Sequence, residues 1–155
     1  MTTQDDSPQR AVISSFERIL AVLAAAASTF LTIALWRSVS GQQSMWPLPG
    51  LYFVELPAAA IAAAVAFLRR DPARALVAWV SAGIYGAFSI LGAFSVGLFY
   101  LPVAIMLIML AVLTTVRQAQ GFLWGVMAFV IAALAQAALM FLFINLLYAA
   151  QAGSR

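Results

Sequence analysis

The stretch from Ala75 to Val116 constrains the fold most, because it contains no charged residue and is roughly twice the length of one membrane crossing. Glycine, serine and proline gather at one place within it, in the segment GAFSVGLFYLP that runs from Gly92 to Pro102. Such residues favour a tight turn between apolar segments. We therefore predict two crossings joined by a turn at Gly92 and Gly97, with Pro102 in the first turns of the second crossing, where proline is tolerated best.

The composition supports a membrane location for the whole chain. Of its 155 residues, 65% are hydrophobic and only 8% are charged, whereas soluble domains carry about 25% charged residues. A soluble fold of this size has too little interior to bury so much apolar surface. We therefore predict an integral membrane protein with one domain.

The same apolar pattern extends along the rest of the chain and predicts an all-α bundle of five transmembrane helices. Residues 1–15 are expected to form a short disordered or interfacial tail, and residues 149–155 a short C-terminal tail. Within the transmembrane domain 16–148, the predicted helices cover about 16–36, 51–68, 75–94, 96–116 and 122–148.

A signal peptide is the alternative interpretation of the first apolar segment, with a small-residue cleavage site at Ser38 to Ser40. The apolar core is longer than that of a usual signal peptide. Asp5, Asp6 and Glu17 also argue against the positively charged start that such a peptide has. A first transmembrane helix is therefore the favoured interpretation.

The arginines predict the orientation, because cytoplasmic loops carry an excess of basic residues. A cytoplasmic N-terminus and an external C-terminus place six arginines inside and two, Arg37 and Arg155, outside. The six predicted to lie inside are Arg10, Arg18, Arg69, Arg70, Arg74 and Arg117.

Several function classes are excluded by residue types that the sequence lacks. The chain has no cysteine, histidine or lysine, so the common zinc, haem and iron–sulfur ligands, a Schiff-base lysine and a Ser-His-Asp triad are absent. The net charge of +3 is small and dispersed, which argues against nucleic acid as a partner. We expect no catalytic, cofactor-binding or metal site and no enzymatic activity.

Two polar residues inside or beside the predicted spans are the main candidates for function. Glu55 is a carboxylate in an apolar helix, which marks an ion path if it is buried; in the outer headgroup layer it would simply meet water or pair with Arg37. Gln136 lies near the middle of the fifth predicted span, where its amide needs a partner. We expect that partner to be a serine, a threonine or a backbone carbonyl of a neighbouring helix.

Two further polar residues are weaker candidates. Tyr85 shares one helix face with Ser81 and Ser89, because the three are spaced by four residues. Asn145 lies near the end of the fifth span, on the face opposite Gln136. The two amides therefore do not form one polar stripe.

Four glycines are predicted to lie where helices pack closely. Gly83 and Gly86 form a small-residue face on the third helix. Gly121 and Gly125 form a GxxxG pair at the start of the fifth helix, which is a weak signal in a glycine-rich membrane protein.

The sparse polarity and the small-residue faces favour a non-enzymatic structural or accessory subunit that packs against itself or a larger membrane complex. The alternative is a small oligomeric transporter or channel with Glu55, Tyr85 and Gln136 around a solute path. A polar cavity at Gln136 would favour transport, and dry packing there would favour the subunit. Membrane lipids are the expected surroundings. The alanine-rich, arginine-only composition favours a GC-rich bacterial genome, so we expect the protein in a bacterial plasma membrane, the cell inner membrane.

Overall fold

The computed structural model describes residues 7–39, 50–93, 95–118 and 121–152. Most of these residues are helical, with no strand among them, and five helices are long and apolar enough to cross a membrane, which confirms the predicted five-helix transmembrane bundle. A short 3₁₀ helix, η1 (Gly97–Tyr100), precedes the fourth of them. The five helices are α1 (Ser7–Val39), α2 (Gly50–Leu68), α3 (Arg74–Leu91), α4 (Leu101–Gln118) and α5 (Phe122–Ala152).

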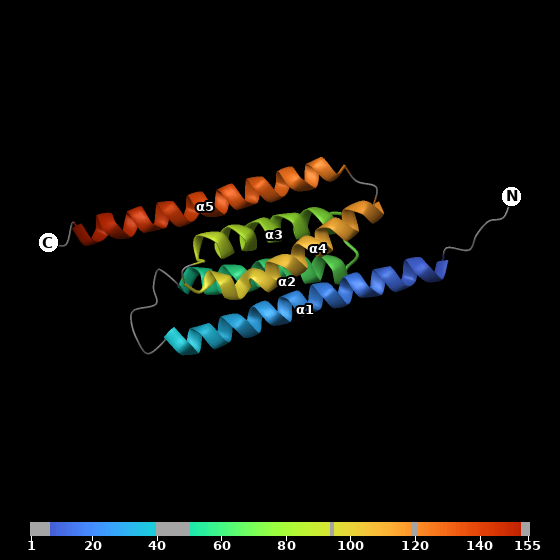
Figure 1. The fold of residues 1–155 in the computed structure, drawn as a ribbon, viewed down its shortest axis with the longest axis horizontal. Coiled ribbons are helices and arrows are strands. Elements are labelled where there is room, and N and C mark those ends of the chain that lie inside the picture. The colour runs from blue at the N-terminus through green and yellow to red at the C-terminus, as the bar shows by residue number, and fades with distance from the viewer. Residues whose placement is uncertain (1–6, 40–49, 94, 119–120, 153–155) are drawn as a thin grey trace.

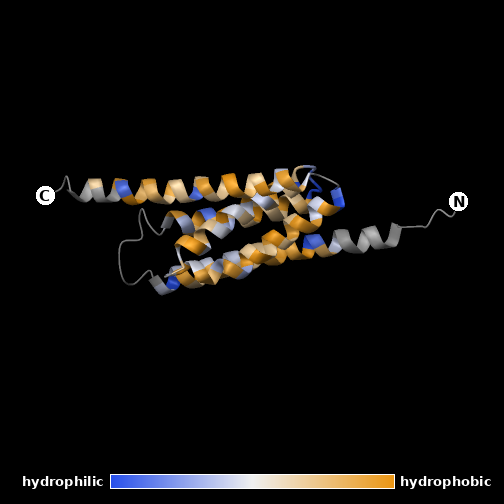
Figure 2. Cartoon of the chain, turned by 45° about the horizontal axis from the view of Figure 1, so that its top comes forward, coloured by the Kyte–Doolittle hydropathy of each residue, from blue (hydrophilic) through white to orange (hydrophobic). Residues whose placement is uncertain are grey.

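The first four helices form a closed unit and the fifth lies against its side (Figure 1). Helix α1 packs against α2 and α4, and α3 packs against the same two helices from the other side. Helix α5 packs mainly on α3, and its C-terminal part runs past the ends of the other helices. Figure 2 shows hydrophobic residues along all five helices, with hydrophilic residues gathered where α2 meets α3 and α4 meets α5.

The helices begin and end close to the predicted spans, with two extensions. Helix α1 begins at Ser7, inside the segment that the sequence predicted to be a tail. Proline is tolerated in the first helical turn, so Pro8 allows this early start, and no helix breaker follows it before the span. Helix α5 continues to Ala152. The orientation in the membrane stays a prediction, and residues 1–6 and 153–155 lie outside the described part of the chain.

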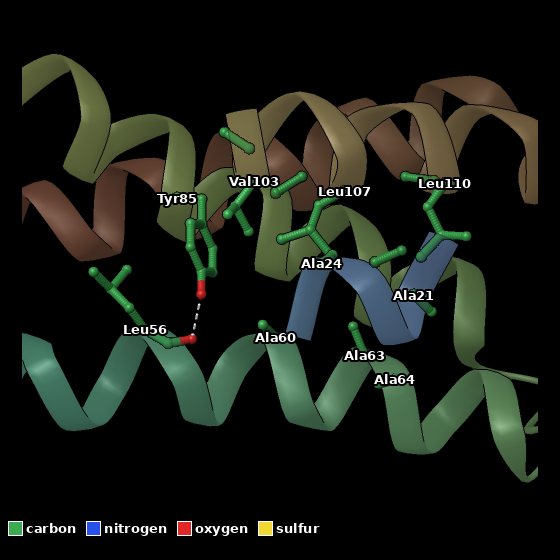
Figure 3. Close-up of a cluster of buried hydrophobic side chains, with 14 of the residues drawn as sticks. Ala21, Ala24, Leu56, Ala60, Ala63, Ala64, Tyr85, Val103, Leu107 and Leu110 are labelled. Carbon is green, nitrogen blue, oxygen red and sulfur yellow. Dashed lines mark hydrogen bonds between the residues drawn. The ribbon is translucent and has the colours of Figure 1, made fainter. Parts of the chain in front are cut away.

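Alanines let α1 and α2 approach closely at the centre of the unit (Figure 3). Ala21 and Ala24 of α1 and Ala60 and Ala63 of α2 are fully buried. Side chains this small allow two helix backbones to approach closely, and the close approach gives many van der Waals contacts. Larger residues of α4, including the fully buried Leu107, fill the space beside them.

The connection between α2 and α3 is a tight, charged turn. The Asp71 N–H donates to the Ala66 carbonyl at 2.9 Å and the Arg70 N–H to the Phe67 carbonyl at 3.3 Å, which is the Schellman pattern of a helix end. Arg70 has φ 55°, a left-handed conformation that glycine usually supplies. The Asp71 carboxylate then accepts the Ala73 N–H at 2.8 Å just before α3.

Two glycines in contact make the turn between α3 and η1. The Gly97 N–H donates to the Gly92 carbonyl at 2.8 Å, and a Cβ on Gly97 would lie 2.5 Å from the Gly92 carbonyl carbon. No described glycine has a positive φ, so the turn depends on the close contact between these two glycines. Pro102 is the second residue of α4, where its missing N–H removes no helical hydrogen bond.

The contact between Gly92 and Gly97 leads to the first prediction. Gly97→Ala should destabilise the fold by about 1–3 kcal/mol, because the new methyl group overlaps backbone atoms that cannot rotate away. Gly121→Ala is the matched control, since its methyl group would meet only the mobile ring edge of Trp124, at 3.3 Å. Unfolding in detergent should show a lower midpoint for Gly97→Ala alone; equal midpoints would contradict the packing argument.

Candidate functional site

A hydrogen bond joins Glu55 of α2 to Gln136 of α5. The Gln136 amide Nε2 donates to the Glu55 carboxylate Oε2 at 3.0 Å, and the Gln136 residue is only 2% exposed. Both helices pack on α3, so the two long side chains reach each other beside it. The sequence led us to expect a hydroxyl or carbonyl partner for Gln136, and the structure corrects this to a carboxylate. A carboxylate is the stronger acceptor, because a hydrogen bond to a charged oxygen is charge-assisted.

The pair also lies closer to one end of the bundle than the sequence suggested. At a rise of 1.5 Å per residue, Gln136 is about 21 Å along α5 from Phe122, and Glu55 is about 8 Å along α2 from Gly50. Gln136 is near the middle of α5 but not of the bundle, because α5 runs past its neighbours at the end where α2 begins. Gln136 therefore lies level with the first turns of α2, because α5 is longer than its neighbours, and its depth in the membrane stays a prediction.

Tyr85 of α3 belongs to a different contact (Figure 3). Its hydroxyl donates to the Leu56 carbonyl of α2 at 2.6 Å and also forms a hydrogen bond with Ser28 Oγ of α1. A tyrosine hydroxyl has one proton, so Ser28 is the donor in the second bond. The structure thus brings Glu55 and Gln136 together and directs Tyr85 to the interface between α1, α2 and α3.

Other buried polar groups are also paired within the bundle. The Ser81 hydroxyl donates to the Ala59 carbonyl at 3.0 Å, and Thr32 Oγ1 lies 2.8 Å from the Tyr100 hydroxyl. Among the described residues, the buried hydroxyls of Tyr52 and Ser89 have no hydrogen-bond partner. Most of the intramembrane polarity is therefore used to join helices.

Asn145 lies apart from these groups. It is exposed, and its Nδ2 donates to the Phe141 carbonyl of its own helix at 2.8 Å. This local bond satisfies the amide without a neighbouring helix. Asn145 and Gln136 are separate, as their positions on the helix indicate.

Three of the four glycines singled out in the sequence lie between α3 and α5. A Cβ on Gly83 would overlap the Phe129 carbonyl oxygen, and one on Gly86 would lie 3.2 Å from the Phe129 ring. A Cβ on Gly125 would overlap the Trp79 indole. Gly121 is exposed and faces only its own helix neighbour Trp124. The two helices are close because these three positions carry no side chain.

A buried ion pair joins α1 to α4, and the sequence analysis did not propose it as a site. Arg117 Nη2 lies 2.8 Å from Glu17 Oε2, with the two side chains 25% and 2% exposed. Arg74, at the start of α3, also attracts this carboxylate electrostatically. One signal was present in the sequence: Glu17 begins the first span and Arg117 ends the fourth, so both were predicted on the same side of the membrane.

Among the described residues, two clefts lie between the helices at the same end of the bundle. One has a volume of about 260 Å³ and is lined by residues that include Trp79, Thr115 and Gly125. The other has a volume of about 430 Å³ and is lined by Leu76, Trp124 and Ile131 among others. Neither is lined by Glu55, Tyr85 or Gln136. Among the described residues no group of three or more acidic side chains could hold a metal ion.

Comparisons with known proteins give no relative: no family model, no curated protein and no solved structure matches this chain.

The Glu17–Arg117 pair gives the second prediction. Arg117→Ala should cost about 3 kcal/mol of stability, because it leaves the buried Glu17 carboxylate without its nearest counter-charge. The double variant Glu17→Leu, Arg117→Leu should recover most of that loss, since it removes both charges. Arg69→Ala, at an exposed position, is the control and should change stability by less than about 0.5 kcal/mol. The three variants are compared by their unfolding midpoints in detergent. The pairing is refuted if Arg117→Ala lowers the midpoint no more than Arg69→Ala does.

Proposed function

We propose that the protein is a non-enzymatic structural or accessory subunit of a membrane, which packs against itself or against a larger membrane complex. The observation that carries this proposal is the environment of Gln136. Its amide is buried, 2% exposed, and donates to Glu55. A side chain that holds two helices together in this way acts as a clamp, and it has no surface left for a passing solute.

The positions of the other polar residues support the clamp over a solute path. A pore or transport site needs polar groups that line a hydrated route. Tyr85 donates to a backbone carbonyl on α2 and accepts from Ser28, so its hydroxyl is occupied within the bundle. The two described clefts lie beside α5 and do not reach Glu55 or Gln136.

The outer face of α5 supports packing against another protein. Only 6% of the residues in its most apolar 18-residue stretch are buried within the chain. Large side chains project from this stretch and the turn after it, with Leu134 65% and Phe141 70% exposed. A large exposed apolar face marks an interaction site in soluble proteins. In a membrane the same face meets lipid or another helix, and α5 also extends beyond the bundle that would shield it.

The proposed setting is the plasma membrane of a bacterium, with the N-terminus in the cytoplasm. The arginine distribution supports this orientation, because the basic turn Arg69–Arg74 and Arg117 lie at one end of the bundle. Membrane lipids are the surrounding partners of all five helices.

The third prediction separates the clamp from a solute path with a double-mutant cycle on Glu55→Ala and Gln136→Ala. A clamp should give a coupling free energy of about 1 kcal/mol, the size expected for a hydrogen bond between membrane helices. Vesicles that contain the wild type should show no proton or sodium flux above that of empty vesicles. The measurements are unfolding in detergent, a trapped pH dye and a sodium-sensitive dye. Wild-type flux that disappears in a variant of unchanged stability would overturn the proposal in favour of transport.

The fourth prediction tests the packing role of α5. A photo-crosslinking residue in place of Leu134 on α5 should form crosslinks to protein in native membranes, because that face is proposed to meet a partner helix. The same residue in place of Phe30 on α1, which is 72% exposed, is the matched control and should crosslink mainly to lipid. Crosslinks to lipid alone at both positions would refute the packing role.

A further inference from the structure

We propose that the groove between the start of α3 and the start of α5 binds one anionic phospholipid. The phosphate headgroup would lie at the arginines of the α2–α3 turn, and an acyl chain would lie along the groove. This inference goes beyond the proposed function, and its test does not require a partner protein on α5. It rests on three observations: an apolar groove, a rigid floor and an exposed basic turn at the end of the groove.

The two clefts described above adjoin and form this groove. They share Leu76 of α3 and Trp124 of α5 as lining residues. The larger cleft, of about 430 Å³, begins at Pro72 and Ala73 in the turn and continues along α5 to Ile131. Its volume lies within the range of about 300–1,000 Å³ that is typical of small-molecule sites.

Small residues and a fixed tryptophan explain why the groove is hollow. Trp79 packs directly on Gly125, where a Cβ would overlap its ring. The Trp79 indole N–H donates to Thr115 Oγ1 at 2.9 Å, which holds the ring in this position. Ala128 continues the wall beyond it. The groove is therefore a fixed feature of the packing between α3, α4 and α5.

The outer wall is open toward the surrounding lipid. Trp124 is 76% and Ile131 62% exposed. Tryptophan favours the level of the headgroups, where its ring meets hydrocarbon and its N–H meets polar groups. An acyl chain can thus enter from the side, without a gate.

The turn at the head of the groove carries an excess of positive charge. Arg69–Arg74 holds three arginines and one aspartate, and the Asp71 carboxylate is already bonded to the Ala73 N–H. Arg69 and Arg70 are exposed, and among the described residues neither takes part in an ion pair. Arg70 also keeps its charged side chain at a left-handed backbone position where glycine would be less strained.

The combination selects an anionic phospholipid as the occupant. A basic pocket between transmembrane helices suits an anionic headgroup, and each arginine near the membrane surface adds about fivefold in affinity. A zwitterionic lipid gains less binding free energy there, because the positive charge of its own headgroup is repelled by the arginines. A water-soluble phosphate would leave the apolar groove empty, and a peptide would have to enter from within the bilayer.

The test uses the purified full chain in detergent and native mass spectrometry. Dioleoylphosphatidylglycerol and dioleoylphosphatidylcholine are titrated separately, since they differ only in the headgroup. We expect one tightly bound phosphatidylglycerol, with an affinity at least about tenfold above that of phosphatidylcholine. Arg70→Gln should lower the phosphatidylglycerol affinity about fivefold, and Arg37→Gln, one arginine removed at the opposite end of the bundle, should leave it unchanged.

A second pair of variants tests the groove itself. Ile131→Trp should fill the groove and weaken phosphatidylglycerol binding, whereas Ile144→Trp, on the same helix but away from the groove, should not. Ile131 is 62% exposed, so the larger side chain does not disturb the core. Equal affinity for the two lipids would overturn the proposal. An unaffected Ile131→Trp variant would also overturn it, because the arginines would then attract lipid without a groove, and so would an equal loss in Arg37→Gln.

Discussion

The structure depends on one constraint: inside a bilayer, a polar group must find its partner within the protein. The backbone meets this constraint by forming helices, and the side chains meet it between helices. Tyr85 bonds to α1 and α2 at once, Ser81 to α2, and Trp79 to α4. Each bond joins helices that small residues have already brought close. The polar groups therefore fix which helix faces which, while the alanines and glycines fix how near the helices come.

The two polar contacts that involve a glutamate lie toward opposite ends of the bundle. The Glu17–Arg117 pair ties α1 to α4 at the end where α4 finishes, and the Glu55–Gln136 bond ties α2 to α5 toward the end where α2 begins. Charges are least costly near the membrane surfaces and most costly at the centre. The centre of the bundle accordingly holds alanines, leucines and hydroxyl groups, and no described ion pair.

The sequence predicted the number and the approximate positions of the helices because these depend on local composition. The uncharged stretch from Ala75 to Val116 had to turn, and its glycines and proline showed where. The pairing of Glu55 with Gln136 was not predictable in the same way, because it depends on the relative depth of two helices that are far apart in the chain. Gln136 lies opposite Glu55 because α5 is longer than its neighbours. No local sequence pattern predicts how far one helix is shifted along its axis relative to another.

The arrangement of the helices in the bundle also cannot be predicted from the apolar pattern of the sequence. Helix α5 is apolar on all sides, like a helix at the centre of a bundle, yet it lies at the edge. In a membrane, lipid is as apolar as the core, so hydropathy does not distinguish the two positions. What holds α5 at the edge is specific: close packing at Gly83, Gly86 and Gly125 where it meets α3, and the bond from Gln136 to α2. The same contacts that hold α5 against α3 leave the groove open beside Trp124, so the attachment of the helix and the shape of the groove have one cause.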